Sequence, residues 1–168
     1  MSPHCLSDIE ASIIELAQAT NTNPQLLLDD WRNRMAAVQG RVKQRTRPRV
    51  SVLEWVDPLF CAGHWLAEMI EIAGGNDRFA RKREDSIRIT WQELWEWQPE
   101  VIIVAPCGYN ESQAREQIKL LETLPGWNKM PAVKAGRVYP VDANAYLVRP
   151  GPRLIEGLEI LEKLFHPA

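Results

Sequence analysis

The alternation of strand-like and helix-like segments after Arg49 constrains the fold more than any other feature of the sequence. Residues 101–105, VIIVA, form a continuous apolar run, which is typical of a strand buried on both faces of a sheet. The same pattern predicts strands at 50–55, 86–90, 101–105 and 137–141, and helices at 63–73, 92–97, 111–124 and from 152 onward. Because strands joined by helices pair in parallel, we predict an α/β fold with a mostly parallel sheet and helices on both faces.

Two helices precede this alternating region. The first is predicted to begin at Ser7 or Asp8, and the second to run from Pro24 to Gln44. At about 1.5 Å per residue the second helix spans roughly 30 Å, the width of a small domain. Its predicted core stripe is Leu27, Trp31, Met35, Val38 and Val42. We therefore predict two parts, with N-terminal helices in residues 1–46 and an α/β lobe in residues 47–168.

Composition excludes several classes of protein. Apolar residues make up 45% and charged residues 25%, and the net charge of −2 gives no basic surface for nucleic acid. No apolar run reaches the roughly 18 residues of a membrane-spanning helix. The opening residues, MSPHCLSDIE, lack the basic and apolar regions of a signal peptide, so a cytoplasmic location is expected for the chain as it stands. The three cysteines show no paired pattern and are expected to be free thiols.

Three segments that follow predicted strands carry aromatic and amide side chains. Open α/β sheets bind ligands beyond the carboxyl ends of their strands. The segments span residues 55–64, 105–110 and 142–153, and they contain the aromatic residues Trp55, Phe60, Tyr109 and Tyr146. We expect these rings to form a wall for a large planar ligand, with polar groups from Asn110 and Asn144. Trp55 and Phe60 could instead be core residues, and core packing is the expected role of Trp91, Trp95 and Trp97.

Catalytic and metal-binding hypotheses rest on fewer residues. Cys107 could act as a nucleophile with His64 as its base, which would make the protein a thiol- or metal-dependent enzyme. Cys61 and His64, three residues apart, could bind a metal with Cys107, but a structural zinc site needs four ligands. His166 is expected to lie in a solvated terminus. No phosphate-binding glycine loop is present, so we expect a binding protein without catalysis and without a prosthetic group.

Six short segments of the sequence together resemble a known family. In chain order they are LEWVDPLFCAGHW (53–65), AGG (73–75), APCGY (105–109), PGW (125–127), GRVYPVDANAY (136–146) and RPGPR (149–153). This series resembles the cobalamin-binding branch of the substrate-binding proteins of ABC transporters. That family has two lobes joined by one long helix and also includes siderophore and haem binders. Several segments in the right order are far more specific than a single motif.

The resemblance implies a chelatase-like lobe that holds cobalamin or a related corrinoid in a cleft between two lobes. It identifies the helix at 24–44 with the interlobe helix and implies a periplasmic location. The ligand-facing residues that the resemblance implies are Trp55, Asp57, Cys107, Tyr109 and Tyr146. The amide side chains in the segments after the strands add Asn144 to this set. A haem or iron-siderophore ligand is the alternative, and the lack of an arginine cluster argues against anionic siderophores.

The sequence departs from the family in two ways. A family member would carry an N-terminal lobe of roughly a hundred residues before Ser2, so the chain is expected to be a truncated, C-terminal half. We therefore expect weak or absent ligand binding by the monomer, and a homodimer formed through apolar surface on the N-terminal helices. In addition, the glutamate that docks on the ABC permease corresponds here to Val148, which puts such docking in doubt.

Overall fold

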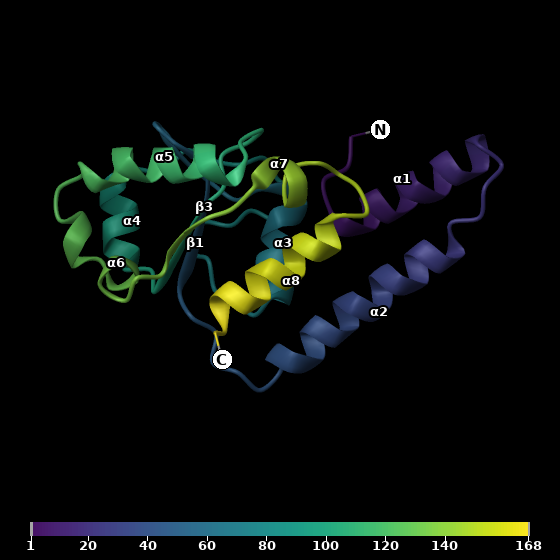
Figure 1. Cartoon of the computed structure of the whole chain (residues 1–168), viewed down its shortest axis with the longest axis horizontal. Helices are drawn as coiled ribbons and strands as arrows, with labels where there is room; N and C mark the ends of the chain where they lie inside the picture. The colour runs from purple at the N-terminus through teal and green to yellow at the C-terminus, as the bar shows by residue number, and fades with distance from the viewer. Residues whose placement is uncertain (1, 168) are drawn as a thin grey trace.

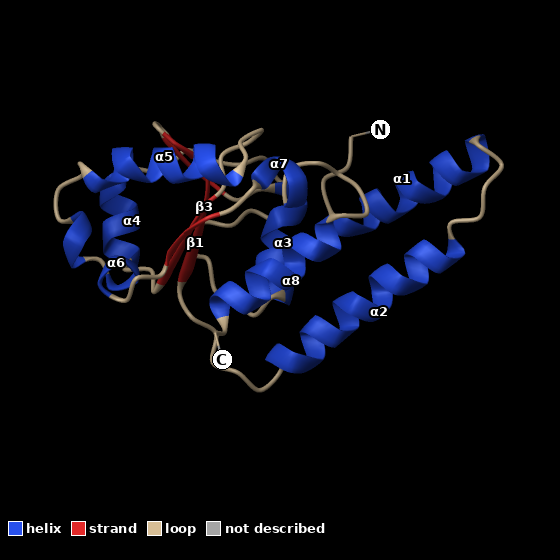
Figure 2. Ribbon diagram, viewed as in Figure 1, coloured by secondary structure: helices blue, strands red, loops and turns tan. Residues whose placement is uncertain are grey.

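The computed structural model describes residues 2–167, in which a four-stranded sheet is covered by helices on both faces (Figures 1 and 2). The strands are β1 (Val50–Val56), β2 (Leu59–Cys61), β3 (Val101–Val104) and β4 (Val138–Pro140). Their order is β2-β1-β3-β4; β3 pairs in parallel with β1 and β4, whereas β2 is antiparallel to β1. The predicted α/β class with a mostly parallel sheet is confirmed.

The helices occupy the connections between these strands and the N-terminal region. They are α1 (Leu6–Ala19), α2 (Gln25–Val42), α3 (His64–Ile72), α4 (Trp91–Trp97), α5 (Glu111–Glu122), the 3-10 turn η1 (Trp127–Lys129), α6 (Pro131–Lys134), α7 (Ala143–Tyr146) and α8 (Leu154–Phe165). Figure 1 shows α1 and α2 as a hairpin that extends away from the sheet, with α2 beside α8. The predicted boundary between residues 46 and 47 falls between α2 and β1 and stays a prediction. Residues 1 and 168 of the two predicted parts lie outside the described residues.

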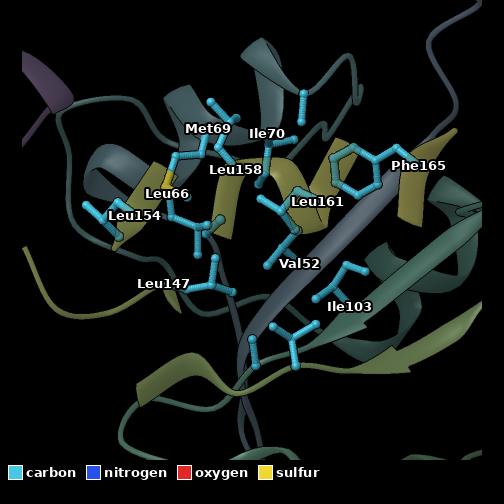
Figure 3. Close-up of a cluster of buried hydrophobic side chains, with 14 of the residues drawn as sticks. Val52, Leu66, Met69, Ile70, Ile103, Leu147, Leu154, Leu158, Leu161 and Phe165 are labelled. Atoms are coloured by element: carbon cyan, nitrogen blue, oxygen red, sulfur yellow. The ribbon is translucent and has the colours of Figure 1, made fainter. Parts of the chain in front are cut away.

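Strand β3 divides the apolar core into two clusters. Its four residues are fully buried, and their side chains alternate between the two faces of the sheet. Val101 and Ile103 pack with α3 and α8, as Figure 3 shows for Ile103, Val52 and the leucines of α8. Ile102 and Val104 pack on the other face with residues of α4, α5, η1 and α6. The continuous apolar run therefore reflects burial on both faces, as predicted.

Helix α2 is attached to the lobe by apolar packing and by two ion pairs with α8. Arg34 donates to both carboxylate oxygens of Glu159 at 2.9 and 2.8 Å, and Arg41 binds Glu162 in the same way. Hydrogen bonds from the two guanidinium groups lower the pKa of Glu159 and of Glu162. The predicted apolar stripe is partly wrong, because Leu28 is buried with Trp31 and Val38 whereas Leu27 is 40% exposed.

Three local expectations are wrong. The segment at 86–90, predicted to be a strand, makes only one isolated bridge among the described residues, between Arg88 and Phe60. Phe60 belongs to the short strand β2, which had been predicted to be part of a loop. Only Ile89 of residues 86–90 is buried, so the segment lies along the edge of the sheet. His166 is not solvated: its Nε2 lies 3.2 Å from the carbonyl oxygen of Ala73, and burial lowers its pKa.

The Asp77 carboxylate binds the backbone of β1, and its pKa predicts a pH dependence of stability. It accepts hydrogen bonds from the backbone N–H groups of Val52 and Phe79, both at 3.0 Å, and burial raises the pKa of Asp77 to about 6. A pKa raised on folding contributes stability that is complete below the unfolded value of about 3.9. That contribution is lost as the pH rises through about 6.

We expect wild type to lose about 2 kcal/mol of unfolding free energy, relative to Asp77→Asn, between roughly pH 4 and pH 8. Urea unfolding of both proteins across this range measures the difference in slope. All other groups titrate in both proteins, so their contributions cancel. Parallel stability curves would show that Asp77 ionises normally in the fold.

Candidate functional site

The three segments predicted to bind a ligand meet at one edge of the sheet. Trp55 lies near the end of β1, residues 105–110 follow β3, and α7 follows β4. Because these three strands are parallel, their carboxyl ends lie at the same edge. Trp55 is half-buried, and its indole N–H donates to the carbonyl oxygen of Asp57 at 2.9 Å, which fixes the ring beside the β1–β2 turn.

The aromatic wall begins with Trp55 and Tyr109. Their rings meet edge to face, with centroids 5.4 Å apart and planes inclined by 73°. The backbone N–H of Cys107 donates to the carbonyl oxygen of Glu54, which holds the loop after β3 against β1. The carbonyl oxygen of Tyr109 in turn accepts from the backbone N–H of Asn144 at 3.1 Å. The structure thus brings Trp55, Tyr109 and Asn144 together through backbone contacts between three strand ends.

Tyr146 lies on α7, the short helix that also carries Asn144, and each of these two residues contacts an arginine. The Arg153 guanidinium stacks on the Tyr146 ring at 4.7 Å from its centroid, and Arg149 donates to the Asn144 amide oxygen at 2.9 Å. A hollow of about 490 Å³ opens here, lined by Asn144, Ala145, Arg149, Gly151, Pro152 and Arg153. Sequence reasoning assigned neither arginine to the site, although both stand in the RPGPR segment. Two cations beside Asn144 and Tyr146 weaken the expectation against anionic ligands.

Helix α7 itself was missed, although its sequence carries a signal. The Asp142 side chain accepts from the backbone N–H of Ala145 at 2.7 Å and so caps the helix. Asp142 followed by three residues with small side chains or amides is the pattern that could have predicted this turn. The cap fixes the position of Asn144 and Tyr146 relative to β4.

Two other predicted site residues lie at the border of this wall. Asp57 is exposed in the turn between β1 and β2, and Cys107 is exposed in the loop after β3. Phe60 is half-buried on β2. The roles of all six predicted ligand-facing residues stay predictions.

The geometry gives no support to the thiol hypotheses. The Cys61 thiol is buried and donates to the carbonyl oxygen of Phe79 at 3.1 Å, and burial raises its pKa to about 11. Burial, and secondarily the Glu54 carboxylate, raises the pKa of Cys107. Reactive cysteines need a lowered pKa. No hydrogen bond joins Cys107 to His64 within residues 2–167, and the His64 ring contacts Asp85 instead.

Comparison with known proteins places the chain in a family. A model of the family described as periplasmic binding protein matches residues 3–145. The chain belongs to this family. Among the described residues, no helix combines the length and the apolar character needed to cross a membrane.

Three known proteins illustrate the similarity. IsdE of S. aureus, solved in complex with heme, has a TM-score of 0.82 at 21% identity, and the match covers 97% of this chain and 66% of that one. BtuF, the periplasmic vitamin B12 binding protein of Vibrio cholerae, has a TM-score of 0.73 at 20% identity, with coverage of 98% and 62%. The uncharacterized ABC transporter substrate-binding lipoprotein YvrC of Bacillus subtilis (strain 168) is 47% identical over 49 residues, which are 29% of this chain and 15% of YvrC.

These comparisons confirm the resemblance to substrate-binding proteins of ABC transporters, which the six sequence segments had indicated. The two structures share the fold with this chain, including its two leading helices. The chain spans 62–66% of the length of these two proteins.

Proposed function

We propose that this chain forms one wall of the ligand site in a substrate-binding protein of an ABC uptake system, and that the ligand is cobalamin or a related corrinoid. The observation that carries the proposal is the aromatic wall, in which Trp55, Tyr109 and Tyr146 come from three adjacent strand ends. The likeness in fold to BtuF supports the choice of ligand.

The wall matches the chemistry of a corrinoid. A corrin ring is large and partly apolar, and amides surround its edge. Aromatic faces stabilise such a ring by burial, while Asn144 and exposed backbone groups can bind the amides. The described residues supply a single wall, so most of the ligand surface stays in water. We therefore expect binding that is measurable but weak.

Haem is the second candidate, because Arg149 contacts Asn144 and Arg153 stacks on Tyr146. Arginine pairs with carboxylates through two parallel hydrogen bonds, and haem carries two propionates. The likeness to IsdE, solved with heme, points the same way. A corrinoid is favoured over haem because the arginines are already engaged, with the Asn144 amide and the Tyr146 ring.

The partners of this chain are also a matter of proposal. Docking on an ABC permease follows from the family, but Val148 is half-buried against the core and offers no carboxylate at the docking position. The homodimer expected from the sequence would use the exposed leucines of the helical hairpin, which are Leu16, Leu26 and Leu27.

Equilibrium dialysis with cyanocobalamin, and separately with haemin, tests the proposed ligand. We expect cyanocobalamin to bind one site per monomer with a Kd above about 1 μM, which corresponds to about −8 kcal/mol. Haemin should bind more weakly than cyanocobalamin. No binding of cyanocobalamin at 1 mM, or a stronger preference for haemin, would overturn the corrinoid proposal, and a submicromolar Kd would contradict a single-wall site.

Cys107→Ser in the same assay separates a binding protein from a thiol enzyme. The change keeps the size and a hydrogen-bonding group of an exposed side chain, so cyanocobalamin affinity should fall less than about fivefold, or about 1 kcal/mol. Complete loss of ligand interaction in this variant would favour the thiol-dependent alternative.

A further inference from the structure

A cluster of potential metal ligands lies outside the aromatic wall. His4 precedes α1, His64 is the first residue of α3, and Asp85 lies in the connection between α3 and α4. One donor atom from each of the three lies within 4.8 Å of the other two. The His64 Nε2 is 3.0 Å from the Asp85 Oδ1, and the rings of His4 and His64 stack with centroids 5.1 Å apart.

The backbone holds His64 and Asp85 together independently of their side chains. His64 has a left-handed conformation, with φ of 51°, and its backbone N–H donates to the carbonyl oxygen of Glu84 at 2.7 Å. A side chain at Gly63 would clash with the backbone nitrogen of Ser86, so this glycine permits the close approach of the two segments. The position of Asp85 beside the first turn of α3 is therefore fixed by the fold.

A second set of contacts holds the N-terminal segment, and with it His4, at the same place. The backbone N–H of Leu6 donates to Glu68 of α3 at 2.8 Å, and that of His4 donates to the Asp8 carboxylate at 2.9 Å. Cys5, which lies between His4 and Leu6 in the sequence, is buried. Three segments separated by up to 81 positions along the chain thus converge without any contribution from the donor atoms themselves.

We propose that His4, His64 and Asp85 bind a divalent transition-metal ion, with zinc as the best match. Two imidazoles and one carboxylate are typical zinc ligands, and three protein ligands leave a fourth position for water or for a donor atom of another molecule. Zinc with bonds of about 2.0–2.1 Å needs donors about 3.4 Å apart. The donors here lie within 4.8 Å, and His4 and Asp85 are exposed side chains that can rotate to close the gap.

The metal site would share no residue with the aromatic wall, so it can be tested separately from the proposed ligand. One link to the wall is Trp65, whose indole N–H donates to the carbonyl oxygen of Leu147 directly after α7. A bound ion would join the segment before α1 to α3. Zinc should therefore stabilise the folded chain as any ligand of the native state does.

Zinc titration of the chain, free of added histidines, tests this site by equilibrium dialysis and by thermal unfolding. We expect one zinc per chain with a Kd in the micromolar range or tighter, and a rise in Tm with zinc. Each of the substitutions His4→Asn, His64→Asn and Asp85→Asn should weaken binding at least about tenfold. Asparagine tolerates the left-handed backbone at position 64, so that variant should fold.

His166→Asn and Cys107→Ser are the matched controls, because they remove other potential ligands that lie outside the cluster. Both should bind zinc and respond in Tm as wild type does. The proposal is overturned if 100 μM zinc neither binds nor raises Tm. It is equally overturned if zinc binding survives the three cluster substitutions, or if either control loses it. Circular dichroism confirms that each variant is folded before it is titrated.

Discussion

Gly157→Ala should destabilise the protein by about 3 kcal/mol, because a Cβ at this position of α8 has no space. It would clash with the carbonyl oxygen of Tyr146 and would lie 3.0 Å from the Leu147 side chain. A backbone carbonyl cannot rotate away as a flexible side chain can, so α7 and α8 must separate. Overpacking of this kind costs about 1–3 kcal/mol or more. Since α7 carries Tyr146, the same change should also disturb the aromatic wall.

Gly40→Ala is the matched control, since it is the same substitution inside another long helix, α2. Among residues 2–167, no atom outside α2 lies within 4 Å of a Cβ at position 40. Alanine should therefore stabilise the protein by about 0.5–1 kcal/mol, through its higher helix propensity. Urea unfolding of the two variants gives opposite signs if α8 packs on α7 as described. Equal effects of the two substitutions would contradict that packing.

The double substitution Tyr109→Ala with Tyr146→Ala should weaken cyanocobalamin binding by at least about thirtyfold. Each ring buries a large apolar area against a planar ligand, and its loss costs about 1–2 kcal/mol. Tyr109 also contacts the Trp55 ring edge to face. The double variant therefore removes a contact that positions Trp55 as well as the apolar area of the two tyrosine rings.

Leu120→Ala is the control for this loss of apolar surface. Leu120 is 47% exposed on α5, outside the proposed wall. Dialysis should show wild-type affinity for the control and a large loss for the double tyrosine variant. Equal affinities in the two variants would place the ligand elsewhere on the molecule.

The sequence predicts those parts of the fold that rest on long or regular patterns. The run at 101–105 predicts β3, and the spacing of Leu154, Leu158 and Leu161 predicts α8, because each pattern reflects burial of a complete face. Strand β2 and helix α7 have three and four residues, which is too few for a period to emerge. Their positions depend on contacts with β1 and Tyr109, which are tertiary.

Some contacts of the candidate site could likewise be predicted from the sequence, and others could not. The rule that ligands bind beyond parallel strand ends brought Trp55, Tyr109 and Asn144 together correctly, because it depends only on strand order. The stacking of Arg153 on Tyr146 depends on the angle at which α8 leaves α7. The meeting of His4 with His64 depends on how the N-terminal segment lies on α3. Neither contact has a local signal in the sequence.

Chemical-shift mapping of a ¹⁵N-labelled sample with cyanocobalamin tests the central claim most directly, because it locates even a weak ligand. Seven indole N–H groups report on separate parts of the molecule. We predict that the Trp55 indole shifts together with the backbone amides of residues 107–110 and 144–146, while the indoles of Trp91 and Trp127 in the second core cluster stay unchanged. Shifts confined to other surfaces, or none at millimolar ligand, would contradict an aromatic wall that binds a corrinoid.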